Sequence, residues 1–412
     1  MPAGLMKPTI FTTILLVCLF SAGCALSQDF DAHLNLIVKP YLFSIARWEL
    51  NAIPHEVNQW LFGEQEKIDD EMRVVTEYFS FVEQIKTLKS KIGVANAGNE
   101  ESDLALLEAE LNKLQEQKMT LGGRVERIIE KQIRHTLTEQ GIFNPIDSYV
   151  GLKVSFPPIN FKLEKPPNLL VISPREKIES IREITLTPNL PLEEIGAIEV
   201  KVDELGVSSL VVGLSGLGVT YPTFVTNEAS LRSTIDTTVE EWLHQYLVFR
   251  PLGFLYLLDL TGLSRNYEIA TMNESLAGMV SEEVGSIVYG KYYSEYENDA
   301  DLVQVAEPAF DFYREMREIR KTIDIYLEQG EIEQAEEFME QKRQYLASMG
   351  YYIRKLNQAY FAFHGTYADS PAFISPIGLE LKELRRQSVS LKSFINTVAA
   401  MASRQELKDS IR

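Results

Sequence analysis

A heptad repeat in the first third of the chain constrains its fold more than any other feature. Apolar residues follow one another in alternating steps of three and four, with one lysine among them: Leu104, Leu107, Leu111, Leu114, Lys118, Leu121, Val125 and Ile128. This spacing is typical of a helix that packs along one seam against a partner helix. A half-buried strand would bury every second residue instead. The region is therefore predicted to form a long helix.

A second helical pattern precedes the heptads and supplies a partner for them. Its apolar residues also repeat at three and four: Tyr78, Phe81, Ile85, Leu88 and Ile92. Residues 93–99 are rich in Gly and Asn, which predicts a loop between two helices. We expect an antiparallel coiled-coil hairpin inside a helical region at residues 29–144. It is interpreted either as internal scaffold or as an arm that reaches a protein partner or spaces the body from a membrane.

The pattern changes near Pro145 from helical periodicity to short strand-like runs. These runs are separated by prolines and turn residues, and they lie at 156–160, 166–174, 184–187 and 209–220. Helical periodicity returns in four later segments, at 231–250, 273–289, 305–363 and 377–411. The expected fold class is α+β and predominantly helical, with one small antiparallel sheet. We expect a core domain at 145–300 and a C-terminal helical subdomain at 301–412.

Charge and cysteine content exclude several classes of function. The 412 residues include 40 Lys and Arg against 59 Asp and Glu, which gives a net charge of −19. Such an excess of acids argues against nucleic acid as a partner and against adhesion to anionic lipid through a basic surface. Cys18 and Cys24 are the chain's two cysteines. A metal bound by the rest of the chain would therefore need His, Asp or Glu ligands.

The N-terminal residues have the pattern of an export signal. Lys7 is followed by an apolar run at 9–20 and then by small residues, which predicts a secretory signal at residues 1–26. The apolar run is short for a membrane span.

The end of this segment, Phe-Ser-Ala-Gly-Cys24, resembles the lipobox of bacterial lipoproteins. The resemblance implies cleavage before Cys24 and a lipid on its sulfur, so that a bacterial protein is tethered outside the cytoplasmic membrane. Ser21 departs from the usual leucine. The alternative is ordinary signal cleavage near Ala25 or Ser27, which would make the protein secreted.

One predicted helix carries residues suited to metal chemistry. In the segment Glu240-Glu241-x-x-His244, the first and last residues lie one turn apart on the same helical face. Their carboxylate and imidazole are placed to hold one cation. The pattern differs at one position from His-Glu-x-x-His, the zinc-binding helix of metalloproteases. Thirty residues after His244, a second helix contains Asn273-Glu274-Ser-Leu-Ala.

These motifs together resemble those of the gluzincin metallopeptidases, over about residues 207–290. The resemblance implies a zincin-like core in which Glu240, His244 and Glu274 bind zinc and Glu241 is the general base. It also implies that the Gly-rich segment ending at Tyr221 supplies the edge strand that pairs with a substrate backbone.

Glu240 departs from the family pattern, which has histidine at this position. With two carboxylates, the zinc site would be formally neutral and would activate water less strongly. More oxygen ligands also favour harder ions such as Mn²⁺ or Mg²⁺. Three outcomes stay open: an active variant with an unusual metal, a metal site without turnover, and an inactive protease whose groove still binds peptide.

Residues near the end of another predicted helix are weaker candidates. His364 precedes a glycine, and Tyr367 follows three residues later. Either side chain is able to donate a hydrogen bond to a tetrahedral oxyanion. The alternative is that His364 caps the carbonyls of the helix end near Gly365.

The sequence thus predicts an exported metallopeptidase-like protein that hydrolyses peptides outside the cytoplasm. The alternative is a catalytically inactive lipoprotein that binds a peptide or protein as a scaffold. Whether the site with Glu240, Glu241 and His244 is catalytically active distinguishes the enzyme from the scaffold.

Overall fold

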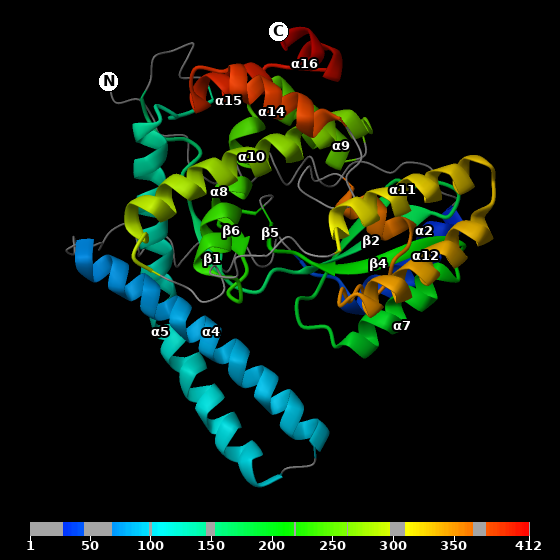
Figure 1. Ribbon diagram of the computed structural model, residues 1–412, viewed down its shortest axis with the longest axis horizontal. Helices are drawn as coiled ribbons and strands as arrows, with labels where there is room; N and C mark the ends of the chain where they lie inside the picture. Colours follow the sequence, from blue (N-terminus) through cyan, green and yellow to red (C-terminus); the bar gives the residue numbers. More distant parts are fainter. Residues whose placement is uncertain are drawn as a thin grey trace.

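Helices form most of this computed structural model, and two three-stranded sheets lie among them (Figure 1). The structure describes residues 28–44, 68–98, 101–145, 153–217, 220–261, 263–296, 310–365 and 376–411. The predicted fold class, α+β and predominantly helical, is confirmed at this level. The predicted signal at 1–26 with Cys24, and also Tyr367, lie outside the described residues. Within these residues, no helix is both long enough and apolar enough to cross a membrane.

Two long helices form an arm that leaves the body of the molecule. Helix α4 (Ile68–Gly98) and helix α5 (Glu101–Glu139) lie side by side and run in opposite directions (Figure 1). The predicted loop at 93–99 is wrong for residues 93–98, because α4 continues to Gly98. A glycine in a helix costs only about 1 kcal/mol relative to alanine, and the neighbouring Ala and Val residues tolerate a helix.

Burial along α5 follows the heptad spacing. The seam residues at 104–114 are half-buried, while Val125, Ile129 and Ile133 near the body are fully buried. The last three pack in the main core together with Val75 and Phe79 of α4. The base of the arm is therefore part of the protein core. Supercoiling of the two helices stays a prediction.

The first sheet is antiparallel and has helices on both faces. Its strands are β2 (Asn168–Pro174), β3 (Arg182–Leu186) and β4 (Val207–Gly213), in the order β3-β2-β4. Leu170 and Ile172 point to the face covered by α2 (Gln28–Val38) and α7 (Leu192–Asp203). Val171 points to the opposite face, against α13 (Gln358–His364). The short 3-10 helix η1 (Lys39–Tyr41) follows α2.

The second sheet is mixed, so the prediction of a single antiparallel sheet is incomplete. Strand β6 (Thr223–Val225) pairs in parallel with β1 (Phe161–Leu163) and antiparallel with β5 (Gly216–Leu217). The Gly-rich segment at 209–220, expected to be one strand, supplies β4 of the first sheet and β5 of the second. Because β5 stands at one end of the strand order, it is an edge strand.

Three helices form the centre of the molecule: α8 (Leu231–Leu247), α9 (Pro251–Leu260) and α10 (Tyr267–Tyr292). Ser230 caps α8 by accepting a hydrogen bond from the Ser233 backbone N–H. Helix α8 ends at Leu247, and Pro251 begins α9. Proline suits the first turn of a helix because a backbone N–H at that position has no hydrogen-bond acceptor within the helix, so its absence costs little.

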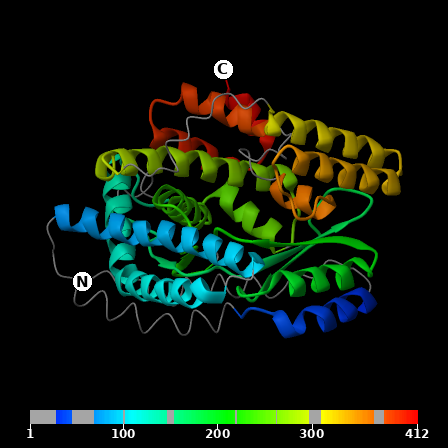
Figure 2. The same cartoon turned by 60° about the horizontal axis from the view of Figure 1, so that its bottom comes forward.

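The C-terminal part contains helices α11 (Phe312–Glu328), α12 (Ile332–Ser348), α13, α14 (Ile377–Gln387), α15 (Leu391–Ala399) and α16 (Arg404–Ser410). Gly330 and Gly350 follow α11 and α12 with φ of 75° and 92°, where other side chains are strained. The helical segment expected at 377–411 forms the three helices α14, α15 and α16. They lie over α10, on the side of the molecule opposite α2 (Figure 2).

Candidate metal centre

The predicted ligands come together where α8 and α10 pack against each other. Glu240, His244 and Glu274 each offer one ligand atom, and these atoms all lie within 4.8 Å of one another. His244 Nε2 is 3.7 Å from Glu274 Oε2. Two ligand atoms of a tetrahedral zinc ion, each about 2 Å from the metal, stand roughly 3.3 Å apart. The donor set therefore fits one ion after small side-chain movements.

Asn273 fixes the orientation and the tautomer of His244. The Nδ1 atom of His244 lies 2.7 Å from Oδ1 of Asn273, and a carbonyl oxygen can only accept a hydrogen bond. This contact fits the tautomer with the proton on Nδ1, in which the lone pair of Nε2 faces Glu274. Burial lowers the pKa of His244, while Glu240 and the contact with Asn273 oppose this shift. A neutral histidine held through its other ring nitrogen is the form that binds metals.

Tyr256 on α9 is a site residue that the sequence analysis missed. Its hydroxyl donates a hydrogen bond to Glu274 Oε1, and its ring stacks on His244 with the centroids 5.7 Å apart at 30°. The hydrogen bond to Oε1 leaves Oε2 as the atom that faces His244. The available signal was Pro251 followed by nine mostly apolar residues, because proline is common in the first turn of a helix.

Glu241 lies against the edge strand β5. A Cβ atom added at Gly216 would come within 2.5 Å of Glu241 Oε1 and within 2.6 Å of Thr237 Cγ2. Only glycine lets the strand approach α8 this closely. Gly216 thus brings β5 onto the helix that carries the candidate base.

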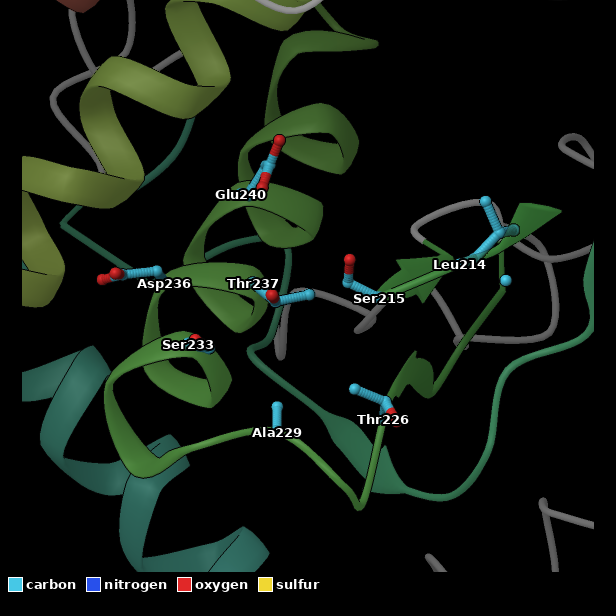
Figure 3. A pocket seen from close by; sticks show the side chains of 9 residues that line it. Leu214, Ser215, Thr226, Ala229, Ser233, Asp236, Thr237 and Glu240 are labelled. Atoms are coloured by element: carbon cyan, nitrogen blue, oxygen red, sulfur yellow. The ribbon is translucent and has the colours of Figure 1, made fainter. Parts of the chain in front are cut away.

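A pocket of about 470 Å³ opens beside Glu240. Thr237 and Glu240 of α8 line one wall, and Leu214 and Ser215, just before β5, lie across from them (Figure 3). Thr226 closes the lower side in this view. The candidate centre is therefore next to open space large enough for part of a peptide.

His364 ends α13, which covers the first sheet. Its ring contacts Tyr360 and Phe363 of the same helix, with centroid distances of 4.3 and 5.0 Å. Burial lowers the pKa of His364 to about 4, so the ring is neutral near pH 7. The described contacts are with its own helix rather than with α8 or α10, and a role as an oxyanion donor stays a prediction.

Comparison of the chain with models of known families, with curated protein sequences and with solved structures finds no match.

Proposed function

We propose that the protein binds one divalent metal ion through Glu240, His244 and Glu274 and uses it to hydrolyse peptides. The observation that carries the proposal is the approach of three ligand atoms to within 4.8 Å, from two helices whose motifs are thirty residues apart in sequence. Neutral His244, held by Asn273, supports it further. The gluzincin resemblance of these motifs names the reaction class.

The chain's own residues have separate tasks in this reaction. When bound, the ion supplies a Lewis acid that polarises a peptide carbonyl. Glu241 accepts the proton of the attacking water as general base. Tyr256 holds Glu274 so that Oε2 faces the centre. A peptide enters through the pocket beside Glu240.

The charge of the ligand set bears on the choice of metal. Two carboxylates and a neutral imidazole cancel the charge of a divalent ion. Such a set has more oxygen ligands than a two-histidine site, which favours harder ions. We therefore propose Zn²⁺ as the first ion to test and Mn²⁺ as the second.

Metal titration of the purified protein tests the site. We expect one ion per chain by elemental analysis and a rise in the unfolding midpoint with added Zn²⁺ or Mn²⁺, since a ligand that binds only the folded state stabilises it. His244→Ala and Glu274→Gln should remove both effects. Glu282→Gln, an exposed change on the same helix as Glu274, should keep them. Protein without stoichiometric metal, whose midpoint neither ion moves, would exclude the centre.

A second candidate function is an inactive scaffold that binds a peptide or protein partner. Two observations favour it: the neutral ligand set with Glu240, and the α4/α5 arm that extends from the body (Figure 1). The variant Glu241→Gln separates the two functions. It should abolish peptide hydrolysis in an enzyme and leave metal content unchanged, whereas a scaffold should bind its partner equally well with either residue.

We also propose that the protein is exported and anchored by a lipid on Cys24, with secretion as the alternative. The support is Lys7, the apolar run at 9–20 and the small residues before Cys24. Metabolic labelling with a fatty acid should mark the wild-type protein in a bacterial host. Labelling that survives in Cys24→Ser would contradict the assignment.

A further inference from the structure

We infer that the outer surface of the α2/α7 layer faces the lipid bilayer when the protein is anchored. This inference rests on the proposed lipid anchor at Cys24. The layer covers one face of the first sheet, and its inner side packs in a core that includes Leu34 and Ile198.

Chain length restricts which part of the protein reaches the membrane. Three residues separate Cys24 from Gln28, the first residue of α2. Four residue steps span at most about 14 Å, even when fully extended. The start of α2 is therefore held close to the lipid headgroups. The C-terminal helices α14 to α16 lie on the opposite side of the molecule (Figure 2).

The α2/α7 layer exposes large apolar side chains on its outer surface. Leu36 of α2 is 72% exposed, and Leu192 and Val200 of α7 are 73% and 60% exposed. Single exposed apolar residues are ordinary, but here three of them lie on the two helices of the layer whose first residue follows the anchor.

Charge indicates the kind of lipid surface that fits. The net charge of −19 and the exposed Glu193 and Glu194 on α7 disfavour anionic headgroups. The contact is therefore apolar, with a zwitterionic surface.

Single introduced cysteines test this orientation, because both native cysteines lie within the first 24 residues. Leu36→Cys and Val200→Cys place a polarity-sensitive fluorophore on the α2/α7 layer. Leu379→Cys is the matched control, since Leu379 is 71% exposed on α14 at the opposite side. In phosphatidylcholine vesicles, we expect a blue shift and quenching by nitroxide-labelled lipid at least threefold stronger for the first two labels than for the control.

Equal quenching at all three positions, or none at any, would overturn the orientation. A second form of the protein tests the surface inference independently of the proposed lipidation. It carries six histidines in place of residues 1–24 and binds vesicles that contain nickel-chelating lipid. If native protein carries no lipid but the tagged form shows the same labelling difference, the surface inference stands and the proposed lipidation fails. If native protein is lipidated and no difference appears in either form, the surface inference fails and the lipidation stands.

Discussion

Glutamate side chains at the junction of α5 with β1 and at the crossing of α8 with α10 have different surroundings. At the junction, Glu126 accepts a hydrogen bond from the Leu163 N–H at 2.8 Å and contacts Lys162 Nζ at 3.0 Å. Glu130 accepts a hydrogen bond from the Phe161 N–H at 3.1 Å. These carboxylates bond the edge of β1 in place of another strand.

The crossing of α8 and α10 groups its carboxylates around a neutral imidazole instead. Glu274 accepts a hydrogen bond from the Tyr256 hydroxyl, and its Oε2 lies 3.7 Å from His244 Nε2. Burial lowers the pKa of His244. A ligand atom of Glu240 comes to the same place. Two nearby carboxylates repel each other, and a divalent cation removes that repulsion. The junction thus pairs its carboxylates with backbone N–H groups and a lysine, whereas a divalent cation is our proposed partner for the carboxylates at the crossing.

Glu130 offers the largest expected effect at the junction. Burial raises its pKa to about 8, with nearby Glu126 adding to the rise and the Phe161 N–H opposing it. The folded pKa lies above the unfolded value of about 4.5, so the charged form destabilises the fold above pH 8, and the cost disappears as pH falls toward 4.5. Glu130→Gln should match wild type near pH 5 and exceed its free energy of unfolding by up to about 4 kcal/mol at pH 9. Urea denaturation across this range measures the difference, and a constant offset would contradict the raised pKa.

A pair of truncations breaks or sharpens the comparison directly. Glu126→Ala should lower the free energy of unfolding by about 3 kcal/mol, because it leaves Lys162 and the Leu163 N–H without their acceptor. Glu240→Ala in metal-free protein should cost less than about 1 kcal/mol, because it relieves repulsion with Glu274. Chemical denaturation in the presence of a chelator gives both values. A loss at Glu240 as large as that at Glu126 would make the crossing a structural device too.

Two glycines of α10 test how closely this crossing is packed. A Cβ atom at Gly285 would lie 1.7 Å from Asp236 Oδ1 of α8, so Gly285→Ala should destabilise the protein by about 2 kcal/mol. Gly278 is the matched control, because a Cβ atom there meets nothing within 4 Å. Gly278→Ala should be neutral or stabilise by up to about 1 kcal/mol through helix propensity. Thermal unfolding compares the two, and equal losses would mean that the space beside Gly278 is filled.

The smallest expected effect concerns the histidine. Asn273→Ala removes the acceptor for His244 Nδ1 and should weaken zinc binding about tenfold, the lower end for loss of such a partner. Isothermal titration with Zn²⁺ measures the change. Asn396→Ala on the remote helix α15 serves as the control and should leave the affinity unchanged. Unchanged affinity in Asn273→Ala would mean that the imidazole is oriented by other contacts.

Local sequence patterns predicted much of the fold, and less of the site. The heptads of α5 and the breaks at Gly330 and Gly350 depend on neighbouring residues, so they are readable along the chain. Two other features could not be predicted from the sequence: the continuation of α4 through residues 93–98 and the division of the Gly-rich segment between two sheets. Each depended on a balance of weak local preferences, which tertiary packing decides.

The sequence by itself determined that Glu240 and His244 share one helical face, because the helical period fixes neighbours four residues apart. It also supplied Glu274 as a candidate on a later helix. Only the tertiary structure brought that carboxylate within 3.7 Å of His244, placed Tyr256 against both and turned Asn273 toward the imidazole. These distances follow from how α8, α9 and α10 pack, and packing depends on side chains from the whole chain rather than on any local period.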